Sequence, residues 1–305
     1  MRSVRDAKAK KLGEFLKAKR SQSAPADLGL PESGHRRVSG LRRDEVAAQA
    51  SISTDHYLRI EQGRRNPSDD VLESIARVLK LSPEEREYVF ELSRGAGAPG
   101  SDSRRDPEEP PLIPAAVSQA MHSMPVPALI HNGRFDFLAA NRLGRALYAD
   151  LLERQPVQPN LARFAFLDPF SRESLPDWGD IADQVVASLR WEVARSPLDE
   201  DLSDFIAELA TAGDEFTRRW ESQNVATNRP GSKRVNHPVV GPMTLNYASM
   251  EIQGSNGLFF STFTAEPGSP SEEALRELDR WAATREMQSE DPAYEEVRST
   301  TGRGL

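Results

Sequence analysis

The sequence predicts a multidomain protein in which an all-α domain is followed by an α+β domain. Apolar residues recur at helical spacing through the first ninety residues, and the stretch after them is rich in Gly, Pro and charged side chains, as linkers are. Beyond this stretch, short apolar runs lie on both sides of a long helical region, which is typical of an antiparallel sheet with inserted helices. We therefore expect domains at residues 1–94 and 112–285, joined by a linker at 95–111 and followed by a flexible tail at 286–305.

The first domain is expected to contain helices alone. The clearest helix start is at Ser82, because Ser82 can cap the helix, Pro83 fits its first position and Glu85 can complete a capping box. Ser68 is a second candidate for a helix cap. The expected helices span residues 7–21, 43–50, 53–62 and 68–79, and the fifth begins after Ser82.

Residues 43–62 predict a helix-turn-helix, in which small Ala47 and Ala50 allow two helices to cross closely and Tyr57 helps to lock the turn. The second helix of such a pair offers its first turn to base edges in a DNA major groove, while basic neighbours contact phosphates. A helical bundle with no role in DNA binding is the alternative. The candidate DNA-binding residues are Arg36, Arg37, Arg42, Arg43, Ser53, Thr54, Asp55, His56, Arg59, Arg64 and Arg65.

Charge is divided unevenly along the chain. Residues 1–66 hold 15 Lys and Arg against 8 Asp and Glu, whereas residues 95–305 hold 20 against 32. A local basic patch suits phosphate contact even though the whole chain has a net charge of −8. Within the basic part, residues 23–41 form an insertion with Arg36 and Arg37. This insertion is either a basic arm that touches DNA or a loop packed on the side of the domain.

The stretches LRRDEVAAQASIS, TDHYLRIEQGRR and NPSDDVLESIARVLKL resemble, in this order, the helix-turn-helix of XRE-type (Cro/repressor-like) bacterial regulators. The chain departs from that pattern at Ser51, where the family usually has Gly because the turn prefers a positive φ. The resemblance implies a sequence-specific transcription regulator. One such motif reads only a few base pairs, so we expect a homodimer on a near-palindromic operator in double-stranded DNA.

The second domain is expected to begin with a hairpin, because two apolar runs flank Asn132-Gly133 in PALIHNGRFDFLAANR. Helices are expected over 141–152, 181–194 and 202–223. Strands return in RVNHPVVGPMTLNYASMEI, where Leu245, Tyr247 and Ser249 alternate with their neighbours, and in GLFFSTFTAE. The order of strands, helices and strands predicts the α+β class.

The first domain contains LGEFLKAKR and HRRVSGLRRDEV, and the second contains PVPALIHNGRFDFLAANRLGRALY, DWGDIADQVVASLR, DEFTRRWESQNV and KRVNHPVVGPMTLNYASMEI. With these stretches the chain resembles the MmyB-like regulators over about residues 10–268. The resemblance implies a PAS-like ligand-binding domain after the DNA-binding one, and a small apolar ligand such as a fatty acid.

The ligand-binding residues remain open at this stage. Aromatic side chains on the inner face of a sheet either line a cavity or fill the core, while Arg190 and His237 could anchor a carboxylate or a hydroxyl. Alternatively, the second domain is a protein-interaction module without a ligand. The linker composition predicts that any signal between the domains passes through a dimer interface. The candidate ligand-binding residues are Phe135, Phe137, Arg190, Trp191, Phe216, Trp220, His237, Tyr247 and Phe263.

Several classes of protein are not expected from this sequence. It has no Gly-rich phosphate loop, no GxSxG or HExxH motif and no cysteine, so we expect neither an enzyme nor a cofactor or metal site. No apolar run approaches the length of a signal peptide or a membrane span. We therefore expect a cytoplasmic, nucleoid-associated protein that does not contact the membrane.

Overall fold

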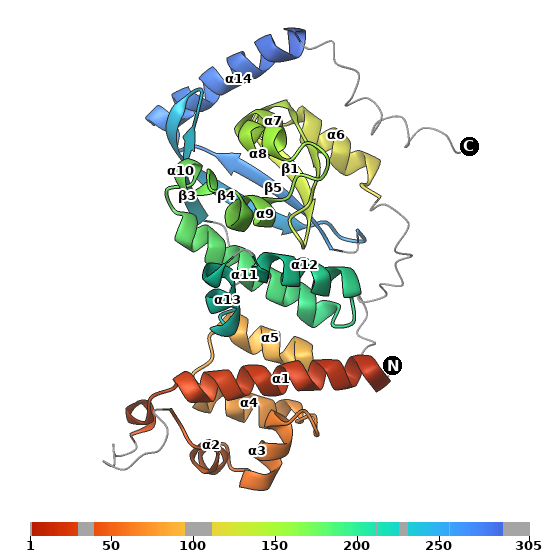
Figure 1. Cartoon of the computed structure of the whole chain (residues 1–305), viewed down its shortest axis with the longest axis vertical. Helices are drawn as coiled ribbons and strands as arrows, with labels where there is room; N and C mark the ends of the chain where they lie inside the picture. Colours follow the sequence, from red (N-terminus) through yellow and green to blue (C-terminus); the bar gives the residue numbers. More distant parts are fainter. Residues whose placement is uncertain are drawn as a thin grey trace, which may run out of the picture.

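The computed structural model describes residues 2–29, 40–94, 112–211, 213–225, 231–255 and 257–288. It confirms a helical domain followed by an α+β domain, which lie below and above the middle of Figure 1. Arg36, Arg37, the expected linker at 95–111 and residues 289–305 of the expected tail lie outside the described residues.

The first domain follows the helix signals in its sequence. The cap at Ser82 is confirmed, since its hydroxyl accepts from the Glu85 amide at 3.2 Å and its own amide donates to the Glu85 carboxylate at 2.9 Å. Ser68 holds the cap position without a side-chain hydrogen bond. Within the described part of this domain, the helices are α1 (Arg2–Gln22), the 3₁₀ helix η1 (Pro25–Leu28), α2 (Arg43–Gln49), α3 (Thr54–Glu61), α4 (Asp69–Val78) and α5 (Pro83–Ser93).

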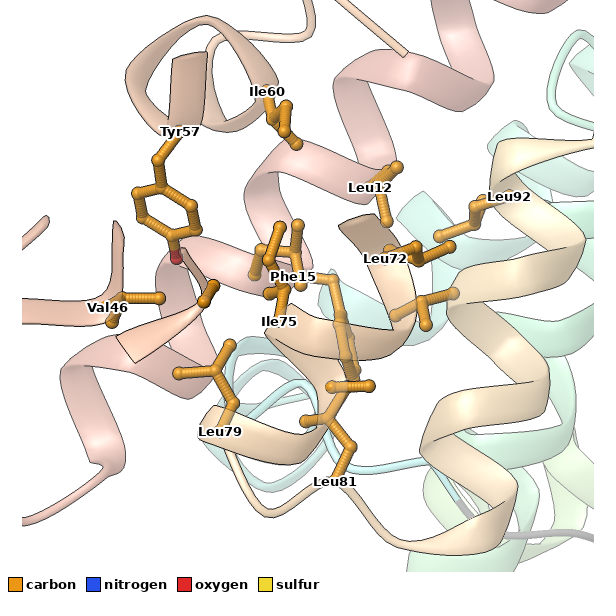
Figure 2. Packing of buried hydrophobic residues seen from close by; sticks show 14 of the residues in the cluster. Leu12, Phe15, Val46, Tyr57, Ile60, Leu72, Ile75, Leu79, Leu81 and Leu92 are labelled. Carbon is orange, nitrogen blue, oxygen red and sulfur yellow. The ribbon is translucent and has the colours of Figure 1, made fainter. Parts of the chain in front are cut away.

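One apolar cluster holds these helices together. Figure 2 shows Phe15 of α1, Tyr57 of α3, Ile75 of α4 and Leu92 of α5 turned toward a common centre, and all four are almost fully buried. Burying an aromatic or branched side chain of this size is worth about 1.5–3 kcal/mol, so tertiary packing stabilises helices as short as the eight-residue α3.

Two of the positions with an unusual backbone or an unusually close contact concern the placement of α3. Ser51, in the turn between α2 and α3, has a φ of 57°, as the family pattern with Gly at this point implies. At Gly13, α1 crosses the end of α3 so closely that a Cβ atom would lie 2.3 Å from the carbonyl oxygen of Glu61. The absence of a side chain at Gly13 therefore sets the distance between α1 and α3.

The second domain is built on a five-stranded antiparallel sheet with the strand order β2-β1-β5-β4-β3. Strand β1 is buried because it has a neighbouring strand on each side and helices on both faces. In β4 the predicted alternation is confirmed, since Met243 and Leu245 are buried while Thr244 and Asn246 are exposed. The strands are β1 (Ala128–Asn132), β2 (Phe137–Ala140), β3 (Gly231–His237), β4 (Gly241–Glu251) and β5 (Leu258–Thr264).

Helices cover the two faces of the sheet unequally. One face packs against α7, α14 and the group around α11, and the other is covered in part by α6. Helix α14 continues to Gln288, three residues into the stretch predicted as tail. The helices described in this domain are α6 (Ala115–Ser123), α7 (Arg142–Leu147), α8 (Ala149–Arg154), α9 (Leu161–Leu167), α10 (Ser171–Ser174), α11 (Trp178–Arg195), α12 (Glu200–Thr211), α13 (Asp214–Glu221) and α14 (Pro270–Gln288).

Two helices that the sequence predicts as continuous are interrupted. The helix expected over 141–152 breaks at Tyr148, whose φ of −109° and ψ of 26° end α7 and let its ring turn toward the sheet. The helix expected over 202–223 breaks at Gly213, whose φ of 139° separates α12 from α13. Hydrophobic periodicity continues across both breaks, so it does not reveal them.

The predicted hairpin is confirmed, but its turn differs from the expected one. Asn132 closes the turn by accepting from the amides of Arg134 and Asp136, each at 3.0 Å, and the positive φ falls on Phe135. Gly133 instead faces α11, where a Cβ atom would lie 2.0 Å from the Glu192 side chain. Gly133 thus permits the hairpin turn to lie close to α11.

The two domains are in direct contact through α5 and α11. Tyr88 of α5 meets the edge of the Trp191 ring at 5.4 Å, and Ala194 and Val225 join the apolar cluster of the first domain. Gln22 at the end of α1 donates to the carbonyl of Ser222 at 2.9 Å. In Figure 1, α5 and α1 accordingly lie between α11 and the helix-turn-helix.

We expect Gly13→Ala to destabilise the protein. Alanine is a better helix former than glycine by about 1 kcal/mol, but a clash with backbone atoms at 2.3 Å forces helices apart and costs about 1–3 kcal/mol. Chemical unfolding should show a net loss. Gly179→Ala in the first turn of α11 is the control, because its Cβ has 3.9 Å of room, and it should leave stability equal or higher. Equal effects of the two changes would contradict the close crossing.

Candidate functional site

The helix-turn-helix forms an exposed surface at the end of the molecule away from the second domain (Figure 1). His56 is half-buried among the predicted residues on this surface. The others that the structure describes are all exposed, namely Arg42, Arg43, Ser53, Thr54, Asp55, Arg59, Arg64 and Arg65. The surface therefore combines the exposed start of α3 with five exposed arginines on α2, α3 and their flanking residues.

The start of α3 is held by local hydrogen bonds. Ser53 caps the helix, and its hydroxyl accepts from the amide of His56 at 3.2 Å. Asp55 forms an ion pair with Arg59 one turn later at 2.9 Å, and both side chains are more than half exposed. Because exposed pairs of this kind contribute little to stability, Arg59 can leave Asp55 at small cost.

A buried carboxylate under this surface was not predicted from the sequence. The Glu61 side chain is 1% exposed and accepts from Arg20 of α1 and from Arg43 of α2, each at 2.6 Å. Arg20 also donates to the carbonyl of Leu41 at 2.7 Å. The network ties α1, α2 and α3 together, and it holds the Arg43 side chain against the protein. The sequence carries only a weak signal for it, namely an acid at an otherwise apolar helix position.

In the second domain, a cavity of about 70 Å³ lies between the sheet and α11. An outer cleft of about 300 Å³ adjoins it, shares Lys233 and Tyr247 with it, and is also lined by Asp177, Asp180 and Asp183. The cavity wall contains aromatic and aliphatic side chains with a few polar groups and no carboxylate. It is lined by Leu129, His131, Phe135, Phe137, Tyr148, Leu161, Ile181, Gln184, Val185, Ser188, Lys233, Tyr247, Ser249, Ser261 and Phe263.

Lys233 is the single cation in the cavity wall. Its ammonium group donates to the hydroxyl of Tyr148 at 2.5 Å and lies 4.3 Å from the centre of the Phe263 ring. Burial lowers the pKa of Lys233 to about 7, since no carboxylate lines the wall to offset the lost hydration. A bound anion would therefore stabilise the protonated form of Lys233.

His131 lies on the same wall in its neutral form. Its Nδ1 donates to the carbonyl of Asn132 at 2.8 Å, and its Nε2 lies 3.0 Å from the hydroxyl of Ser261. The ring is stacked between Phe135 and Phe259, and burial lowers the pKa of His131 to about 4. This side of the cavity is consequently uncharged at neutral pH.

The structure separates the predicted ligand-binding residues into two groups. Phe135, Phe137, Tyr247 and Phe263 line the cavity. The other five, Arg190, Trp191, Phe216, Trp220 and His237, lie outside it.

Each residue of the second group has a different place. Arg190 and Trp191 lie at the contact with α5, and Phe216 stacks on Trp220 inside the helical group. His237 is buried with its Nε2 3.0 Å from the carbonyl of Ala146, and burial lowers its pKa.

Lys233 was missed in the sequence, although one signal points to it. It is the only lysine in residues 81–305, where the other cationic side chains are arginines. An arginine stays charged at any physiological pH, whereas a lysine can lose its proton when it is buried. A lone lysine on the inner face of a strand could therefore have been singled out.

Comparisons with known families agree with this geometry. Residues 11–89 match a helix-turn-helix domain, and residues 113–278 match the ligand-binding domain of the MmyB-like transcription regulators. The protein is a DNA-binding transcription regulator of the helix-turn-helix class, and neither matched family is a family of enzymes. The chain belongs to the MmyB-like transcription regulators. No curated protein matches the chain.

Two further searches concern the described residues alone. Among them, no helix combines the length and the apolar character needed to cross a bilayer. The same residues contain no group of three or more His, Asp or Glu side chains placed to hold a metal ion.

We expect Glu61→Ala to destabilise the first domain by about 3–5 kcal/mol, because it leaves Arg20 buried without its counter-charge. Chemical unfolding measures the loss. Glu73→Ala is the matched control, since Glu73 pairs with Arg86 at the surface and such pairs contribute about 1 kcal/mol or less. If the two variants were equally stable, the Glu61 network would not hold the helices together.

Proposed function

We propose that the protein is a sequence-specific XRE-type regulator that binds DNA as a homodimer and responds to a small apolar ligand with one negative charge, such as a fatty acid. The observation that carries the DNA-binding part is α3, which has an exposed first turn and exposed arginines on and next to it in sequence, at the free end of the molecule (Figure 1). A helix of this kind fits the major groove of B-form DNA.

The exposed side chains fall into two groups, those that would contact bases and those that would contact phosphates. Thr54 and Arg59 on α3 are directed to base edges, where arginine forms paired hydrogen bonds with guanine. Arg42, Arg64 and Arg65 flank α3 and would contact phosphates. Arg43 is held by Glu61 through its Nε, which leaves its terminal nitrogens for a phosphate. Phosphate contacts then supply most of the affinity.

A dimer follows from the small size of the reading surface. One α3 covers only a few base pairs, so two copies on a near-palindrome would lie with half-site centres ~34 Å apart or a multiple of that distance. The acidic second domain is repelled by phosphates, which favours an orientation with α3 toward the DNA. Since such a regulator works on chromosomal DNA, we propose a cytoplasmic, nucleoid-associated protein.

The ligand part of the proposal rests on the cavity under α11. Its walls are mostly apolar, and its one cation, Lys233, faces no acidic side chain within the lining. An anionic head group beside Lys233 would raise the pKa of that lysine, while an apolar tail would lie against Phe137 and Phe263. A fatty acid has both parts.

For DNA binding, we expect Arg59→Ala to lower affinity for a duplex selected by the wild-type protein by about 1–3 kcal/mol, with little effect on a scrambled duplex. Fluorescence anisotropy measures both. Arg276→Ala on α14 is the control, since this exposed arginine lies in the second domain. If Arg59→Ala weakened binding to both duplexes equally, Arg59 would be assigned to a phosphate.

The affinity of the wild-type protein for DNA should also depend strongly on salt. With ~6–10 phosphates engaged, it should fall by ~10³–10⁵ between 50 and 200 mM salt.

For ligand binding, we expect dodecanoate to bind more weakly as the pH rises above 7. Free Lys233 has a pKa of about 7, so above this pH the free protein must take up a proton to bind an anion. Affinity should then fall by up to about tenfold per pH unit, and calorimetry should record proton uptake. Below pH 7 the affinity should change little.

Lys233→Met should remove this pH dependence and weaken binding by about 10–100-fold, the value of a charged hydrogen bond. Arg276→Met is the matched control, and it should keep both the affinity for dodecanoate and its pH dependence. A pH-independent affinity in the wild-type protein would exclude Lys233 as the anchor. If no apolar anion bound at any pH, the second domain would be an interaction module instead.

A further inference from the structure

We propose that binding of a ligand in the cavity affects the DNA-binding domain through α11, because this one helix both lines the cavity and packs against α5. The inference rests on the proposed ligand binding and adds the route by which the ligand acts. It replaces the route expected from the linker composition, in which a signal passes only through a dimer interface.

The two roles of α11 fall on different sides of the same rigid element. Ile181, Gln184, Val185 and Ser188 line the cavity, and their spacing places them on one stripe of the helix. Arg190, Trp191 and Ala194 meet the first domain from another side. Trp191 follows Ser188 by less than one turn, about 4.5 Å along the axis. A displacement of the part of α11 that lines the cavity therefore also displaces the part that contacts α5.

Filling the cavity requires its walls to move. The inner cavity of about 70 Å³ is well below the roughly 300–1,000 Å³ of pockets that hold drug-sized ligands, so a ligand seated inside it, beyond the outer cleft of about 300 Å³, pushes its walls apart. The opposite wall is the sheet, where Leu129, Ser249 and Ser261 belong to strands paired by backbone hydrogen bonds. In contrast, α11 is joined to the sheet through side chains, including the Arg195–Glu251 pair at 3.2 Å and the Asp177 carboxylate that accepts from the Arg234 amide at 2.9 Å. Such contacts adjust more easily than a backbone ladder, so α11 is the wall that gives way. Close-packed interiors pass such shifts on to their neighbours.

The interface at the far side of α11 is specific enough to carry the shift. Arg190 is 3% exposed, donates to the side chain of Gln223 at 2.6 Å and meets the hydroxyl of Tyr88. Tyr88 lies between the rings of Trp191 and Phe15, at 5.4 Å and 5.2 Å. Phe15 belongs to α1, which crosses α3 at Gly13. A shift of α11 thus changes how α3 is held relative to the second domain, and so relative to a second copy.

The test fills the cavity with a side chain, so that it depends on neither a ligand nor an operator. In the full chain, Ser249→Phe places a ring in the cavity from β4, opposite α11. Hydrogen–deuterium exchange of the α5 amides, residues 83–93, should change by about fivefold or more, the lower end of usual coupling between sites. Asn246→Phe is the matched control, because Asn246 lies on the exposed face of β4, and it should leave α5 unchanged.

A second variant locates the route. Trp191→Leu keeps an apolar side chain but removes the ring contact with Tyr88, so Ser249→Phe should lose its effect on α5 in that background. If Ser249→Phe does not fold, Ser249→Leu fills the cavity with less bulk and tests the same effect. Unchanged α5 exchange in a folded cavity-filled variant, together with changed exchange in α11, would overturn the proposal.

The same experiment separates this inference from the proposed ligand. Dodecanoate added to the wild-type chain should reproduce the exchange change in α5. If dodecanoate does not bind but Ser249→Phe alters α5, the ligand assignment fails and the α11 route stands. If dodecanoate binds and neither it nor Ser249→Phe alters α5, the α11 route fails alone.

Discussion

The packing of α5 against α11 is the contact on which the arrangement of the whole chain depends. Tyr88 lies between a ring of its own domain, Phe15, and a ring of the other, Trp191, so it joins the two cores. Ala194 and Val225 complete the apolar cluster of the first domain. Separating the domains would expose this cluster to water, at roughly 25 cal/mol for each Å² of apolar surface. The contact leaves α3 free on the opposite side (Figure 1).

Buried charges distinguish the structural centre of the protein from its candidate ligand site. Glu61 is surrounded by two arginines, so its charge is balanced within the protein and it serves to hold three helices together. Lys233 has the hydroxyl and ring of Tyr148 and the ring of Phe263 around it, and no acidic side chain in the cavity wall forms an ion pair with it. Charge that the fold leaves uncompensated is typical of a binding site.

Local signals were sufficient for most of the first domain and for the class of the second. The capping box at Ser82, the turn at Ser51 and the alternation along β4 are properties of neighbouring residues, and each was predicted. The breaks at Tyr148 and Gly213 were not, because the helix pattern continues across them while tertiary packing turns the chain. Lys233 was missed for a similar reason, since the residues that surround it in the cavity come from elements far away in the sequence.

The sequence by itself determined the two fold classes, the helix-turn-helix and its basic surface, because these follow from periodicity, caps and composition over short stretches. Only the tertiary structure decided which aromatic residues line the cavity and which form the interface. Phe137 and Trp191 look alike in sequence, yet one faces the cavity and the other meets Tyr88. The physical reason is that a side chain's partners are set by the packing of α11 between the sheet and α5, and no local pattern records that packing.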